Sequence, residues 1–134
     1  ERRLADAGIL QALEAFGIKL GLDNMRTLVA ALGHPESAYP TVHVAGTNGK
    51  GSVCAMVERA LRAAGLRTGL YTSPHLDRIE ERVAVDGHPV PPAAFEAAAG
   101  DVLAAVDEAA ASGRLEVTPT FFEVTTAIAF ELFR

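Results

Sequence analysis

A glycine-rich segment in this sequence carries the residue types that bind phosphate. Residues 46–52 read Gly-Thr-Asn-Gly-Lys-Gly-Ser. Glycine lets the backbone turn tightly and bring its N–H groups close to an anion, and the start of a following helix adds partial positive charge. Lys50 supplies a full charge and Ser52 a hydroxyl. The segment therefore predicts a cradle for nucleotide phosphates, built from Gly46, Thr47, Asn48, Gly49, Lys50, Gly51 and Ser52.

This segment departs from the general pattern G-x-x-x-x-G-K-[ST]. Val44 stands where the first glycine is expected, and Gly51 follows the lysine in place of a hydroxyl residue. Ser52 must then take the hydroxyl role. A compact ammonium at position 50 suits closely packed phosphate oxygens better than a planar guanidinium does. The alternative interpretation is a glycine-rich turn that carries a solvated lysine.

The elements around this segment are those that a phosphate cradle needs. Residues 41–45 are partly β-branched and predict a buried parallel strand, with His43 in the core. Residues 53–64 have helical apolar spacing, which predicts an amphipathic helix ending at Gly65 with Cys54 on its buried face. Residues 67–72 predict a second strand. Together these elements predict a right-handed βαβ unit.

The rest of the chain predicts further helices and one hairpin. Helical spacing covers residues 4–16 and 23–32, with Asp23 as N-cap and Gly33 as a stop. Residues 73–82 predict an exposed functional loop, and Asp86-Gly87 predicts the turn of a small β-hairpin. A long helix should follow residues 91–92, and a last one should begin at 119–123. The predicted fold class is α/β, a P-loop NTPase-like parallel sheet flanked by helices.

Composition narrows the function classes. The 134 residues are 49% hydrophobic and 22% charged, and the net charge of −5 disfavours a general nucleic-acid role. No apolar run approaches a membrane span, so no membrane partner is expected. Cys54 is the only cysteine, which excludes an internal disulfide and favours a cytoplasmic location. Residue 1 is Glu and residue 134 lies inside an apolar periodic run, so we expect a longer protein.

Several motifs, taken in order, carry a resemblance. They are residues 43–52, Tyr71-Thr72-Ser73-Pro74-His75-Leu76, Glu81-Arg82-Val83, and residues 119–125. With them the chain resembles the folylpolyglutamate synthase and dihydrofolate synthase family, within the Mur ligase superfamily. The resemblance implies that residues 1–134 form the N-terminal part of a Mur-ligase-type ATP-binding domain. A Rossmann-like second domain would lie beyond Arg134.

The resemblance also implies an activity, an ATP-dependent addition of L-glutamate to a pteroate or folate carboxylate through an acyl phosphate. It implies ATP and Mg²⁺ as cofactors, Lys50 and His75 as catalytic residues, and Ser73 and Glu123 as metal ligands. Each of three residues has a structural alternative: Ser73 could start a turn, His75 could stabilise one, and Glu123 could close a capping box with Thr120. The resemblance implies no individual roles for Asp77, Arg78, Phe121 and Phe122; the two Phe rings could flank a folate ring or belong to the core.

Three functions stay open at this point. The first is the front part of a folate-pathway ligase, active only with the remainder of the protein. The second is a standalone phosphate-binding module without catalysis, and the third is a small P-loop kinase. For the chain alone, unpaired sheet edges predict self-association.

Overall fold

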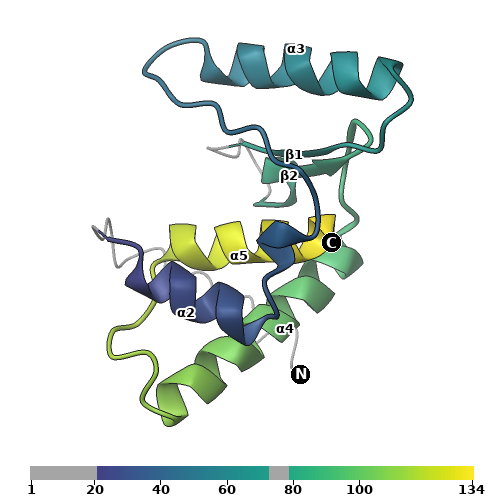
Figure 1. Ribbon diagram of the computed structural model, residues 1–134. Helices are drawn as coiled ribbons and strands as arrows, with labels where there is room; N and C mark the ends of the chain where they lie inside the picture. Colours follow the sequence, from purple (N-terminus) through teal and green to yellow (C-terminus); the bar gives the residue numbers. More distant parts are fainter. Residues whose placement is uncertain (1–20, 73–78) are drawn as a thin grey trace. The chain divides into compact units, whose positions relative to one another are not determined.

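The computed structural model describes residues 21–72 and 79–134 (Figure 1). The described residues divide into two units. One contains residues 21–39, 93–132 and 134, and the other contains residues 40–92 and 133. The helix predicted over residues 4–16 lies outside the described residues. Each unit is treated by itself below.

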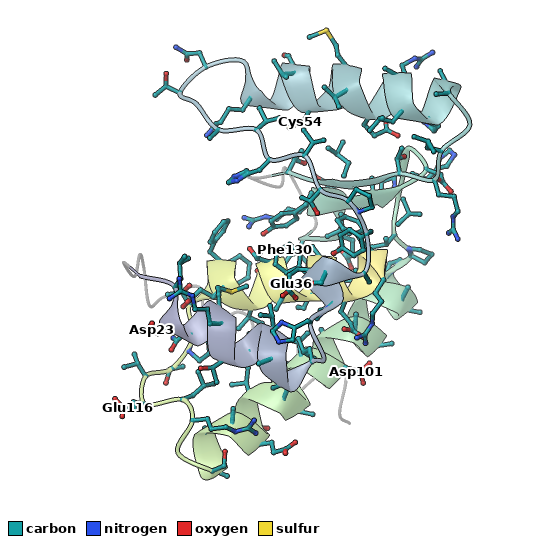
Figure 2. All side chains as sticks on the ribbon, viewed as in Figure 1. Asp23, Glu36, Cys54, Asp101, Glu116 and Phe130 are labelled. Carbon is teal, nitrogen blue, oxygen red and sulfur yellow. The ribbon has the colours of Figure 1, made fainter. Side chains whose placement is uncertain are left out.

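The first unit is helical. It contains α2 (Asp23–Ala31), the short 3-10 helix η1 (Pro35–Ser37), and most of α4 (Pro92–Ala111) and of α5 (Phe121–Phe133). The helices predicted over residues 23–32, after residues 91–92 and from within 119–123 are thus confirmed, and α4 runs through Gly100 without a break. The predicted cap of α2 is wrong, because Leu22 occupies the N-cap and Asp23 is the first helical residue (Figure 2).

An apolar core holds this unit together. α2, α4 and α5 each turn apolar residues inward, since helical spacing places them on one face of each helix. Large side chains of all three are fully buried: Leu28, Val102, Val124 and Ile128. None of the helices that the structure describes is long and apolar enough to cross a membrane.

Tyr39 ties the chain to the last turn of α5. Its hydroxyl donates to the carbonyl of Phe130 at 3.0 Å, which satisfies an oxygen at a helix end. Burial raises the pKa of Tyr39 to about 12, and the negative charges of Glu36 and Glu131 add to the effect. The hydroxyl therefore stays protonated and able to donate at neutral pH.

The second unit combines one helix with a small sheet. It contains α3 (Lys50–Ala63), β1 (Gly69–Tyr71), the 3-10 helix η2 (Ile79–Arg82), β2 (Val83–Val85) and β3 (His88–Pro89). The sheet has the order β1-β2-β3 and is antiparallel throughout. The hairpin predicted around Asp86-Gly87 is confirmed, since Val85 pairs with His88 and both turn residues have positive φ, 50° and 84°.

The strand predicted over residues 41–45 is wrong. These residues form no strand, and Val42 is 67% exposed. A buried parallel strand needs hydrogen-bonding neighbours, and in the described ranges no strand pairs with this segment. The predicted parallel βαβ unit is therefore not formed. His43 is exposed rather than in a core, while the α/β class itself is confirmed.

The apolar face of α3 is also more open than its sequence predicts. Val53 is 41% exposed and Met56 is 64% exposed, while Cys54 is half-buried (Figure 2). The helical spacing was correct, because α3 covers residues 53–63 of the predicted 53–64 and begins earlier, at Lys50. Spacing shows which residues share a face, but burial also requires a partner for that face.

Candidate functional site

The predicted phosphate loop leads directly into α3. Gly49 is the N-cap residue with φ 76°, and Lys50 is the first residue of the helix. Gly46 also has a positive φ, 152°. Both conformations favour glycine, and a Cβ at Gly49 would meet nothing within 4 Å, so the requirement there comes from the backbone conformation. The loop-to-helix geometry of a phosphate cradle is present.

The start of α3 is free of competing side chains. No side chain caps it, and its first turn contains no acidic residue. The first intrahelical bond is donated by Val53 to the Gly49 carbonyl at 3.0 Å, so the amides of Lys50, Gly51 and Ser52 precede the helical ladder. All of these residues are exposed. An anion can therefore reach unpaired amides, the positive end of the helix dipole and the lysine together.

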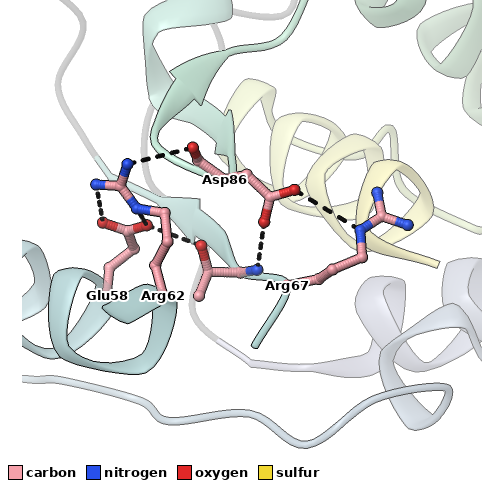
Figure 3. Close-up of polar contacts among 5 residues, drawn as sticks. Glu58, Arg62, Arg67 and Asp86 are labelled. Atoms are coloured by element: carbon pink, nitrogen blue, oxygen red, sulfur yellow. Dashed lines mark hydrogen bonds and ion pairs between the residues drawn. The ribbon is translucent and has the colours of Figure 1, made fainter. Parts of the chain in front are cut away.

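A polar clamp fixes α3 on the sheet (Figure 3). Within α3, Glu58 is the one buried residue. Its carboxylate accepts a hydrogen bond from the Thr68 hydroxyl at 2.7 Å and pairs with the Arg62 guanidinium, Nε to Oε1, at 3.0 Å. Asp86 accepts from the Thr68 amide at 2.9 Å. The helix that carries Lys50 is thus joined, through charged and polar groups, to Thr68, the residue before β1, which in turn is bonded to Asp86, the residue after β2.

Arg62 also lies against the turn of the hairpin. Its Nη1 donates to the carbonyl of Asp86 at 3.5 Å. A Cβ on Gly87 would collide with the guanidinium, and Gly87 has a positive φ as well. The turn and the helix are therefore fitted closely to each other at this point.

Glu123 lies at the start of α5 in the first unit. Its Oε1 accepts from the backbone amide of Thr120 at 3.0 Å, and its own amide donates to the Thr120 hydroxyl at 3.1 Å. These two bonds form the capping box that the spacing predicts. The structural role of Glu123 is thereby confirmed.

The second carboxylate oxygen of Glu123, Oε2, takes no part in the capping box. Oε2 is buried and has no hydrogen-bond partner in the part of the chain that the structure describes. A buried carboxylate oxygen without a partner is costly, and a hard cation is one group that would satisfy it. The residue therefore fits a Mg²⁺ ligand while it still caps the helix, because the two tasks use different oxygens. Among the described residues, no group of three or more acidic, His or Cys side chains gathers around a metal position.

Asn24 is a neighbour of Glu123 that sequence reasoning missed. This α2 residue is 4% exposed, and its amide nitrogen donates to Glu123 Oε1 at 3.5 Å. The two residues are 99 positions apart, so no local pattern links them. The one signal in the sequence is a polar amide within the apolar spacing of a helix.

The residues predicted to form the site do not all lie in one unit of the structure. The loop residues 46–52 lie in the second unit and Glu123 in the first, so each is described within its own unit. Phe122 is 57% exposed, which contradicts a core role for it, and Phe121 is half-buried. Ser73, His75, Asp77 and Arg78 lie outside the described residues.

Curated proteins with similar sequences are folate enzymes. The chain is 43% identical over 121 residues to a probable bifunctional folylpolyglutamate synthase/dihydropteroate synthase of Haloferax volcanii. It is 41% identical over 119 residues to a dihydrofolate synthase/folylpolyglutamate synthase of Bacillus subtilis. These matches cover 90% and 88% of this chain, which spans 14% and 27% of the length of the two relatives. No family model matches the chain.

Solved structures similar to this chain are also folylpolyglutamate synthases. A Mycobacterium tuberculosis folylpolyglutamate synthase, complexed with ADP and AMPPCP, superposes with a TM-score of 0.85 at 35% identity, over 98% of this chain and 29% of that one. A folylpolyglutamate synthase complex with AMPPCP and folate gives 0.84 at 34% identity, over 98% and 32%. Similarity at this level over nearly the whole chain extends from sequence to fold, and the chain belongs to the folylpolyglutamate synthase and dihydrofolate synthase family.

Proposed function

We propose that this chain provides the nucleotide-binding part of an ATP-dependent ligase that joins L-glutamate to a pteroate or folate carboxylate. The observation that carries the proposal is the open, glycine-led start of α3 with Lys50 as its first residue. Residues 1–134 would belong to the ATP-binding domain of this ligase. The single cysteine favours a cytoplasmic location.

The chemistry explains the need for such a loop. A carboxylate is a poor electrophile, so it must first accept the γ-phosphoryl group of ATP before an amine can displace that group as phosphate. In phosphoryl transfer, catalysis comes mainly from positioning and from neutralising charge on the phosphate oxygens. Lys50 would neutralise β and γ oxygens, the amides at the start of α3 would orient them, and the Ser52 hydroxyl would bind one more.

Glu123 would be a ligand of the Mg²⁺ ion that takes part in the same reaction. Its free Oε2 is a hard anionic ligand, and Ser73 is the hydroxyl ligand that the family resemblance implies. When bound, Mg²⁺ would neutralise charge on the nucleotide phosphates. The capping bonds of Glu123 fix the carboxylate at the start of α5, so the ligand would be oriented before the metal arrives.

The proposed substrates follow from relatives. One structural neighbour binds AMPPCP and folate, and another binds DHPP and ADP. An acceptor with a pterin and a carboxylate matches the folate of the first neighbour, and glutamate as the amine is proposed from the family resemblance. His75 is proposed as a further catalytic residue on the family resemblance alone.

Lys50→Ala tests the proposal. In the protein that contains this chain, ADP formation should require both the pteroate or folate acceptor and glutamate. We expect Lys50→Ala to lower kcat/KM by about 100-fold, since one group that neutralises transition-state charge is lost. Arg59→Ala is the matched control, because Arg59 is an exposed cation on the same helix. It should retain wild-type turnover.

Three results would contradict the proposal. Normal glutamate ligation by Lys50→Ala would remove the role given to the lysine. ADP formation that needs a small acceptor but no glutamate would instead identify a kinase. Nucleotide binding without any acceptor-dependent turnover would favour a binding module.

A further inference from the structure

Glu123 has two oxygens with different surroundings, and Asn24 contributes to that difference. Oε1 accepts from the Thr120 amide at 3.0 Å and from the Asn24 side-chain amide at 3.5 Å. Oε2 is buried without a partner in the described ranges. Both donors therefore converge on one oxygen and leave the other free.

From this arrangement we infer that Asn24 is a positioning residue for the metal-ligating carboxylate of Glu123, an inference that rests on the proposed function. Two donors on Oε1 restrict rotation of the carboxyl group and fix which oxygen is presented to a cation. The capping box alone supplies one donor from the neighbouring backbone, and Asn24 supplies one from a separate helix.

The chemistry of Asn24 suits this role. An amide N–H₂ donates a hydrogen bond but carries no charge, so it orients the carboxylate without neutralising it. A lysine or arginine at this position would compete with a divalent cation for the same charge. Asn24 is 4% exposed and Glu123 is 7% exposed, so bulk water does not replace the contact. Groups that hydrogen-bond to metal ligands in this way tune metal affinity.

The test measures metal binding directly. Mn²⁺ serves as a paramagnetic probe, titrated into the protein with AMPPCP present and followed by electron paramagnetic resonance. We expect Asn24→Leu, which keeps the approximate size but loses the donor, to weaken Mn²⁺ binding about 10-fold. Asn24→Gln should restore part of this loss. A cavity of about 280 Å³ is lined in part by Asn24 and Thr27, so the surroundings of residue 24 are not closed on every side.

A double-mutant cycle separates positioning from a general structural role. Glu123→Gln keeps the cap but removes the anionic ligand, so it should weaken Mn²⁺ binding by itself. In that background Asn24→Leu should cause no further loss, because Asn24 acts through the carboxylate. Arg26→Ala, an exposed change on the same helix, is the control and should bind Mn²⁺ as the wild type does.

The outcomes distinguish this inference from the proposed function. Wild-type Mn²⁺ affinity in Asn24→Leu, with weakened binding in Glu123→Gln, overturns the role of Asn24 alone. The role of Asn24 is also overturned if Asn24→Leu lowers Mn²⁺ affinity as much in the Glu123→Gln background as in the wild type. Wild-type affinity in Glu123→Gln overturns the proposed metal role and this inference with it. If Asn24→Leu does not fold, Asn24→Ser, too short to reach Glu123, takes its place with the same expectations.

Discussion

α3 and α5 begin in opposite ways. The start of α3 is exposed, has a glycine as N-cap and lacks any capping side chain. The start of α5 is closed by the reciprocal bonds of Thr120 and Glu123, which are both buried. An uncapped helix start leaves amides unpaired, which costs stability but creates an anion site. A capped start gains stability, and here it leaves one carboxylate oxygen available as well.

The two helices are also held in place differently. α5 contributes Val124, Ala127, Ile128 and Ala129 to an apolar core, whereas α3 buries only the charged Glu58. Apolar packing is insensitive to small rotations, while the clamp of Glu58, Thr68 and Arg62 has defined directions. We infer that α3 depends on few, specific contacts and α5 on many, general ones.

The largest expected effect comes from breaking the clamp. Glu58→Ala leaves the Thr68 hydroxyl and the Arg62 guanidinium without their acceptor, and we expect it to lower the free energy of unfolding by about 1–3 kcal/mol. Hydrogen exchange should accelerate in α3 and β1 but not in α5. Met56→Ala, an exposed change on the same helix, should stay within about 0.5 kcal/mol. Equal effects of the two substitutions would refute a special role for the clamp.

Removing the cap of α5 should have a smaller effect. Thr120→Ala deletes the hydroxyl that accepts from the Glu123 amide, and we expect a loss of about 1 kcal/mol in urea unfolding. Thr118→Ala, an exposed position just before the cap, is the control. Because the Thr120 backbone amide remains, Mn²⁺ binding should be unchanged. A parallel loss of metal affinity would show that the capping and ligand roles of Glu123 are not separable.

The smallest change in stability, and one of opposite sign, is expected at the start of α3. Ser52→Asp places a negative charge in an acid-free first turn and should stabilise the protein by about 0.3–1 kcal/mol. The same charge repels phosphate, so ATP affinity measured by calorimetry should fall about 10-fold or more. Ser52→Asn, whose side chain is similar in size to that of Asp but uncharged, should show a smaller change both in stability and in ATP affinity. Unchanged ATP affinity in Ser52→Asp would argue that phosphate binds elsewhere.

The sequence correctly predicted the turns, helix caps and helices whose structure depends on residues close together in the chain. The capping box at 120–123, the Asp86-Gly87 hairpin and the helix from 92 to 111 all follow from neighbouring residues, and all are present. Gly46 and Gly49 of the phosphate loop adopt the positive φ values for which glycine is suited. The α/β class followed from the same patterns, whereas the sheet of the described residues is antiparallel and not parallel as predicted.

Predictions that depend on distant partners were less successful. Residues 41–45 have the composition of a buried strand but form no ladder, because a strand also needs neighbours. The clamp joins residues on a helix, in the segment just before β1 and in a turn, and none of its members stands out in the sequence. The contact between Asn24 and Glu123 is equally distant, so only three-dimensional structure could bring Asn24 into the candidate site.

The close fit of Arg62 on Gly87 has a consequence for sequence variation. Position 87 is restricted by a backbone φ of 84°, which Asn and Asp tolerate better than other side chains do. A side chain there would also displace the guanidinium of Arg62, the far end of a flexible side chain, from the Asp86 carbonyl and from Glu58. A substitution at 87 should therefore disturb the clamp through Arg62 as well as the turn itself.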